Sequence, residues 1–258
     1  MTIRAVFFDI DGTLFSHTTN AIPLSALEAV EALRKKGILA IISSGRSYQE
    51  IQELPVIQYP FDGYILLNGQ MILNEQFEVI AEDAITGKDK EKLIEVFNEK
   101  EIPLLLVEKD RMYLNFYDER VKKTQSAIAT AVPPLGEYEG DDIFLASAFL
   151  TREERIQLMS RFETLKAVSW HQYGIDILPK HSGKMKGILT YLEKTGIEKD
   201  EIMAFGDAEN DIDMLEYAGI GIAMGNGGED VKAAADFVTR DIDDDGIAYA
   251  LQHFGLID

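Results

Sequence analysis

Apolar and polar residues follow two recurring patterns along this chain. Short apolar runs rich in β-branched and aromatic residues predict buried strands, and stretches with apolar residues every three or four positions predict helices. In the first 82 residues and again after Pro179, strand and helix patterns follow one another in turn. This alternation predicts an α/β fold, with βαβ units around a parallel sheet.

The predicted elements of these two segments can be given by their residue ranges. A first strand ends near Asp9, and further strands lie at 38–42, 64–67, 202–205, 220–223 and 237–239, with an antiparallel hairpin at 71–73 and 77–80. Helices are predicted from a capping box at Ser25 to Gly37, from a cap at Ser182 to about 194, and at 210–217, 229–235 and 246–254.

The middle of the chain has a different pattern. Helices are predicted at 88–100 and 152–162, and strands at 104–107, 143–150, 167–170 and 175–178. None of these predicted strands ends in a pair of acids or in a Ser-Gly turn. We therefore predict an α+β domain at 83–180, inserted into a core domain formed by 1–82 and 181–258.

Composition narrows the possible functions. The chain has 258 residues, which is enough for two domains, and 45 acidic against 25 basic residues give a formal charge of −20. This charge argues against nucleic acid or an anionic membrane as a partner, and no protein partner is implied. There is no cysteine, no evident signal peptide and no apolar stretch near the ~18 residues of a membrane helix. We expect a soluble, cytoplasmic protein.

Two carboxylates directly follow the first apolar strand. Asp9 and Asp11 stand where this strand turns into a loop, and open parallel sheets bind ligands at the carboxyl ends of their strands. Neighbouring acids repel one another and lose water there, so such a pair usually has a cation or a catalytic role. A surface Asp-Gly turn is the alternative interpretation.

Three later positions complete a set of residues that suits phosphate chemistry. They are Ser44 beside Gly45, Lys184 near the start of a helix, and the trio Asp207, Asn210 and Asp211. Carboxylates from separate strand ends suit Mg²⁺. A hydroxyl beside a glycine can bind phosphoryl oxygens, and a lysine can neutralise their charge.

In order and spacing, these motifs resemble those of the haloacid dehalogenase-like (HAD) hydrolases, and within them the Cof-type phosphatases. The four matching segments are Asp9-Ile10-Asp11-Gly12-Thr13, Ser44-Gly45-Arg46, Pro179 to Lys184, and Gly206-Asp207-Ala208-Glu209-Asn210-Asp211. Lys186 is a competing lysine, but the proline spacing favours Lys184. The resemblance implies a Rossmann-like, doubly wound parallel-sheet core with an inserted α+β cap of type C2 that sets substrate specificity.

The resemblance also implies two-step hydrolysis of a sugar phosphate, a nucleotide or a cofactor phosphate. Asp9 would attack phosphorus to form an aspartyl-phosphate, and Asp11 would act as general acid and then general base. The Asp9 carboxylate, the Asp11 backbone carbonyl and Asp207 would bind Mg²⁺. Ser44, Gly45 and Lys184 would bind the phosphoryl oxygens, and Asn210, Asp211, Gly12 and Thr13 would have orienting roles.

Three further residues are candidates for substrate contact. Arg46 either reaches the substrate or holds its own turn, and Trp170 and His171 either contact the substrate or belong to the core of the inserted domain. His17, in the loop after the first motif, is interpreted as an exposed loop residue.

Three alternatives use the same residues or neighbouring ones. A phosphomutase shares the core and differs in what the cap admits, and a non-catalytic protein could use a phosphorylated aspartate as a switch. The run Asp241 to Gly246 begins like a calcium-binding EF-hand loop, but Gln252 stands where that loop needs a glutamate. We interpret that run as an acidic loop before the last helix.

Overall fold

The computed structural model describes residues 2–127 and 130–258, which form two compact units. The first unit contains the chain up to Glu82 together with Ser182–Asp258, and the second contains Asp83–His181. The second unit is thus an insertion between a strand and a helix of the first. The sequence prediction placed this insertion at 83–180.

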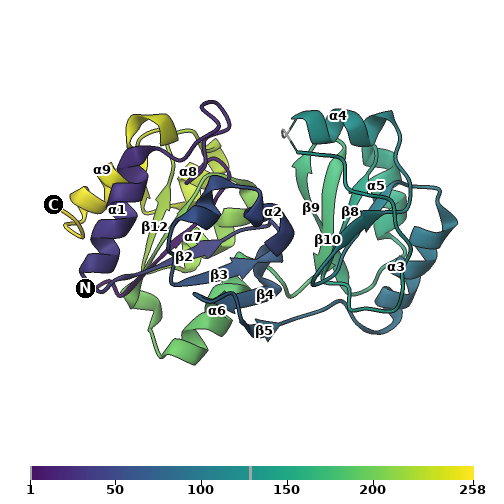
Figure 1. Ribbon diagram of the computed structural model, residues 1–258, viewed down its shortest axis with the longest axis horizontal. Helices are drawn as coiled ribbons and strands as arrows, with labels where there is room; N and C mark the ends of the chain where they lie inside the picture. Colours follow the sequence, from purple (N-terminus) through teal and green to yellow (C-terminus); the bar gives the residue numbers. More distant parts are fainter. Residues whose placement is uncertain (1, 128–129) are drawn as a thin grey trace. The chain divides into compact units, whose positions relative to one another are not determined.

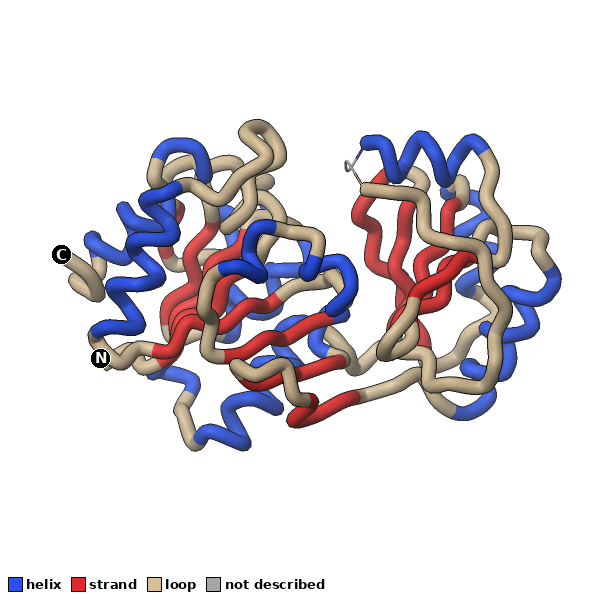
Figure 2. Tube along the Cα trace, viewed as in Figure 1, coloured by secondary structure: helices blue, strands red, loops and turns tan. Residues whose placement is uncertain are grey.

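An eight-stranded sheet runs through the first unit (Figures 1 and 2). Its strands are β1 (Ala5–Phe8), β2 (Leu39–Ser43), β3 (Gly63–Leu66), β4 (Met71–Asn74), β5 (Val79–Glu82), β11 (Ile202–Gly206), β12 (Ile220–Ala223) and β13 (Phe237–Val238). Their order is β13-β12-β11-β1-β2-β3-β4-β5, parallel except for the antiparallel pairings of β4. All four residues of β1 are buried, as expected for a central parallel strand.

Helices cover both faces of this sheet, because the strand order runs outward from β1 in both directions and parallel crossovers are right-handed. The helices are α1 (Leu24–Lys35), α2 (Tyr48–Gln52), α6 (Lys184–Thr195), α7 (Ile212–Tyr217), α8 (Glu229–Ala234) and α9 (Gly246–His253). In the core under α6, the Tyr191 ring meets Phe7 edge-on at 5.9 Å. α1 and α9 lie side by side (Figure 1). The predicted doubly wound α/β core is confirmed.

Two predicted helix caps are wrong. α1 begins at Leu24 after Pro23, so Ser25 lies inside the first turn and the capping box does not form. The fixed φ of proline suits the residue that precedes a helix. α6 begins at Lys184 after Gly183, with no side-chain cap, so Ser182 lies outside it. Lys184 is therefore the first residue of its helix.

The inserted unit is built on an antiparallel sheet of order β7-β6-β8-β10-β9. Its elements are α3 (Gly87–Glu99), β6 (Leu104–Val107), β7 (Met112–Leu114), α4 (Glu119–Ala127), β8 (Leu145–Phe149), α5 (Arg152–Met159), β9 (Leu165–His171) and β10 (Gly174–Pro179). The sequence prediction omitted β7, which is short, and α4, which is mostly polar. Across the described parts of both units, no helix has the length and apolar character that a membrane crossing requires.

Candidate active site

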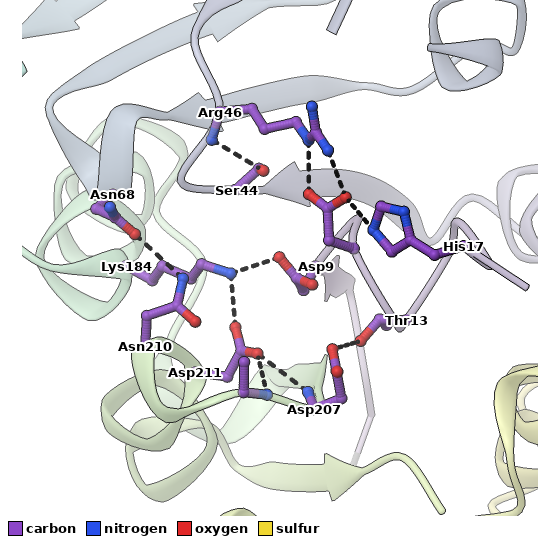
Figure 3. Close-up of polar contacts among 12 residues, drawn as sticks. Asp9, Thr13, His17, Ser44, Arg46, Asn68, Lys184, Asp207, Asn210 and Asp211 are labelled. Carbon is purple, nitrogen blue, oxygen red and sulfur yellow. Dashed lines mark hydrogen bonds and ion pairs between the residues drawn. The ribbon is translucent and has the colours of Figure 1, made fainter. Parts of the chain in front are cut away.

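The motif residues meet at one edge of the core sheet (Figure 3). Asp9 follows β1, Ser44 follows β2 and Asp207 follows β11, while Lys184 opens α6. Because these strands are parallel and paired in register, the residues after them project from the same edge. Lys184 reaches this edge from the start of α6, although it is 175 residues away from Asp9 in sequence.

Lys184 provides the central positive charge of the site. Its buried ammonium donates hydrogen bonds to Asp9 Oδ1 at 2.5 Å and to Asp211 Oδ1 at 2.6 Å. Burial alone would lower the pKa of Lys184, but Asp211 and Asp9 outweigh it and hold that pKa above its ordinary value. Lys186, the competing lysine of the third motif, is exposed.

Three carboxylates surround this single lysine. Asp9, Asp207 and Asp211 each place an oxygen within 4.8 Å of the others. Burial and the neighbouring acids raise the pKa of Asp9 well above its ordinary value despite Lys184, and they raise the pKa of Asp207 to about 7. The lysine therefore leaves negative charge uncompensated, and carboxylate oxygens are ligands that divalent cations such as Mg²⁺ prefer. The acid cluster fits a metal ion.

Asp211 has contacts that distinguish it from the other two acids. Its Oδ1 accepts from Lys184, and its Oδ2 accepts from the backbone N–H groups of Asp207 and Ala208, both at 3.0 Å. A Cβ at Gly206 would lie 2.4 Å from the Asp211 side chain, so the motif glycine permits this packing. Asp211 thus orients the lysine and the loop, and both of its carboxylate oxygens take part in these contacts.

The loop after β1 is fitted closely to Asp207. Gly12 has a φ of +80°, and a Cβ on it would lie 2.2 Å from Asp207 Oδ2. Thr13 Oγ1 donates to Asp207 Oδ1 at 3.0 Å. These two residues hold Asp207 next to the loop that carries Asp9.

Asp11 is held by two side chains and its carboxylate lies outside the three-acid cluster. Arg46 donates Nε to Asp11 Oδ2 at 2.6 Å and Nη2 to Oδ1 at 2.7 Å, and His17 Nε2 lies 2.9 Å from Oδ1. Burial opposes ionisation, but Arg46 and His17 outweigh it and hold the pKa of Asp11 well below its ordinary value. His17 is exposed, as predicted, but sequence reasoning missed its contact with Asp11.

The turn after β2 is tight and partly covered by Asn68. Ser44 is buried, and its Oγ accepts from the backbone N–H of Arg46 at 3.2 Å. A Cβ at Gly45 would lie 3.1 Å from Asn68 Oδ1, which also accepts from Asn210 Nδ2 at 3.3 Å. The sequence analysis did not single out Asn68, so its place beside the motifs was missed.

Trp170 and His171 lie in the inserted unit, at the end of β9. Trp170 Nε1 donates to Asp176 Oδ1 at 2.9 Å, and the ring lies over Gly174, where a Cβ would come within 2.7 Å of it. His171 Nδ1 accepts from the Tyr173 backbone N–H at 3.2 Å. Both side chains therefore stabilise the β9–β10 hairpin, and a role in substrate binding stays a prediction.

Comparison with known proteins places this geometry in a family. The model of the haloacid dehalogenase-like hydrolases matches residues 6–251. The chain belongs to this family. YkrA of Bacillus subtilis is 33% identical over all of both chains. The pyridoxal phosphate phosphatase YbhA of Escherichia coli is 30% identical over 96% of this chain and 97% of its own.

A solved structure agrees with the sequence relatives. The subclass IIB sugar phosphatase BT4131 superposes with a TM-score of 0.86 at 37% identity, covering 98% of this chain and 100% of that one. The resemblance noted from the motifs is thus confirmed over nearly the whole chain. This HAD hydrolase is a phosphatase of the Cof type, a hydrolase of phosphoric monoesters.

Proposed function

We propose that this HAD hydrolase is a Mg²⁺-dependent phosphatase that hydrolyses small phosphorylated metabolites through an aspartyl-phosphate on Asp9. The observation that carries the proposal is the buried ion pair of Lys184 with Asp9 at 2.5 Å. The pair fixes one oxygen of a carboxylate at the ligand-binding edge of the sheet and keeps a cation where an anionic substrate must approach. The names of YbhA and BT4131 support a phosphorylated small molecule as substrate.

Asp9 would act as the nucleophile. While Lys184 holds Oδ1, Oδ2 would attack phosphorus in line, forming an Asp9 O–P bond as the bond to the leaving oxygen breaks. Water would then attack the same phosphorus, breaking the Asp9 O–P bond and releasing inorganic phosphate.

Asp11 would transfer the protons of both steps. In the arrangement seen here, Arg46 and His17 keep Asp11 ionised, which is the form that accepts a proton from the attacking water. Protonating the leaving oxygen in the first step requires a protonated Asp11, so the contact with Arg46 would have to open before that step.

The remaining motif residues would bind the phosphoryl group. The Ser44 hydroxyl, the Gly45 backbone N–H and the Lys184 ammonium would donate to its oxygens, where negative charge must be stabilised. Mg²⁺, held by Asp9, Asp207 and the Asp11 backbone carbonyl, would supply Lewis-acid neutralisation of that charge. The inserted unit would select the substrate, with Trp170 and His171 as candidate contacts.

The test of this function is phosphate release from p-nitrophenyl phosphate and a panel of sugar, nucleotide and cofactor phosphates. We expect turnover with Mg²⁺ and none after treatment with EDTA, restored by added Mg²⁺. Product analysis on a hexose phosphate separates hydrolysis from the mutase alternative, which would give an isomeric sugar phosphate. Turnover that persists in EDTA, or none on any compound, would contradict the proposal.

Mg²⁺ is expected to raise the melting temperature of the protein more at about pH 8 than at about pH 5. The pKa values of Asp9 and Asp207 are higher in the folded protein than in the unfolded chain. Without metal, the folded protein therefore loses stability as pH rises from the ordinary aspartate pKa through these raised values. Mg²⁺ and protons compete for the same carboxylates, so metal stabilises most where both are ionised. Thermal unfolding at both pH values, with Mg²⁺ and with EDTA, measures this, and an equal shift at both would contradict it.

A further inference from the structure

A left-handed turn joins the loops of the proposed phosphate site. Three consecutive residues, Leu67, Asn68 and Gly69, have positive φ values of 53°, 53° and 89°. This conformation is unfavourable for a residue with a Cβ, especially leucine, and it persists only where the surrounding structure imposes it. Here the positive-φ conformation is held by backbone contacts with two neighbouring segments of the chain.

The backbone of the turn holds the loop of the second motif. The Leu67 N–H donates to the Arg46 carbonyl and the Asn68 N–H to the Ser44 carbonyl, both at 3.1 Å. On its other side, a Cβ at Gly69 would lie 2.2 Å from the carbonyl oxygen of Gly183, the residue before Lys184. The turn therefore fixes both the serine loop and the start of α6.

The Asn68 side chain extends these contacts to the loop of the fourth motif. It is 4% exposed, its amide lies against Gly45, and its Oδ1 accepts from Asn210 Nδ2 at 3.3 Å (Figure 3). Asn68 thus links the loop that carries Ser44 with the loop that carries Asp207.

We infer that Asn68 is a positioning residue that orients the Asn210 amide toward the phosphoryl group of the substrate. This inference rests on the proposed phosphatase function. An amide nitrogen has two hydrogens, and when one is fixed on Asn68 Oδ1 the direction of the other is fixed as well. A donor held in place before the substrate arrives stabilises developing charge better than one that must be ordered during the reaction.

The test is a double-mutant cycle with Asn68→Gly and Asn210→Ala. Glycine adopts positive φ readily, so N68G removes the side-chain oxygen and leaves the turn. We expect N68G and N210A each to lower kcat/KM about tenfold, and the double variant to lose no more than the worse single one, because both changes remove one coupled donor. The melting-temperature increase produced by inorganic phosphate should shrink in all three variants.

Matched variants make the result interpretable. Asn20→Gly makes the same change at an exposed asparagine that also has a φ of 53°, and it should behave like wild type. If N68G does not fold, Asn68→Asp, which also tolerates positive φ, keeps an oxygen for the Asn210 amide and should keep kcat/KM within about threefold of wild type; a loss as large as that of N210A would then count against the role of Asn68. Two results would overturn the role of Asn68: losses of kcat/KM that multiply in the double variant, or an N68G variant as active as wild type. Neither would affect the proposed phosphatase function, provided that the wild-type protein shows Mg²⁺-dependent turnover. An inert wild type would instead refute the proposed function.

Discussion

Replacing Asp9 by asparagine is expected to reduce phosphate release by a factor of at least ~10³, because an amide cannot form the phosphoryl ester that a carboxylate forms. The fold should survive this change. Burial and the neighbouring acids raise the pKa of Asp9, so its negative charge costs free energy in the folded protein, and asparagine is neutral with nearly the same shape. We therefore expect a melting temperature for D9N no lower than that of wild type near pH 8.

Initial rates on p-nitrophenyl phosphate with Mg²⁺, together with thermal unfolding, measure both parts of this prediction. Asp200→Asn is the matched control, since it makes the same change at an exposed aspartate just before β11, at the opposite end of that strand from Asp207. D200N should keep full activity. A D9N protein as active as wild type would show that another group is the nucleophile.

Replacing Lys184 by methionine is expected to damage both stability and activity. The change keeps most of the side-chain volume but leaves Asp9 and Asp211 buried without their cation. Breaking one side of a buried ion pair typically costs about 3–5 kcal/mol. Turnover should fall at least ~10²-fold, because a charge that stabilises the phosphoryl oxygens is lost.

The stability loss in K184M should also depend on pH. Lys184 lowers the raised pKa values of Asp9 and Asp207. Without the lysine these two pKa values rise further, so the variant loses stability as pH increases through them. Urea unfolding at about pH 5 and about pH 8 should show the larger loss at the higher pH.

Lys186→Met is the matched control for the lysine variant, because this exposed lysine lies two residues further along α6. It should lose at most a few tenths of a kcal/mol, as surface substitutions usually do. If K186M behaved like K184M, the assignment of the third motif to Lys184 would be wrong.

Because D9N removes a negative charge and K184M a positive one from the same ion pair, their opposite effects on stability test whether the site carries excess negative charge.

The sequence by itself determined the fold class and the set of motif residues. Buried strands such as Ala5–Phe8 are apolar along their whole length, and that local pattern, with alternating helices, is sufficient to predict a parallel sheet. Parallel strands in turn place Asp9, Ser44 and Asp207 at one edge. Local signals were less reliable at helix starts, where the predicted caps at Ser25 and Ser182 were wrong because Pro23 and Gly183 precede the helices instead.

Only the tertiary structure decided which of these side chains meet. Lys184 and Lys186 are the same residue type, two positions apart in sequence. In the folded protein Lys184 is buried and donates hydrogen bonds to Asp9 and Asp211, whereas Lys186 is exposed. The pairings of Arg46 with Asp11 and of Asn68 with Asn210 join residues 35 and 142 positions apart in sequence, and no local pattern encodes them. The physical reason is that hydrophobic periodicity fixes where strands lie, whereas the charge and orientation of each buried polar group depend on neighbours that folding brings from other parts of the chain.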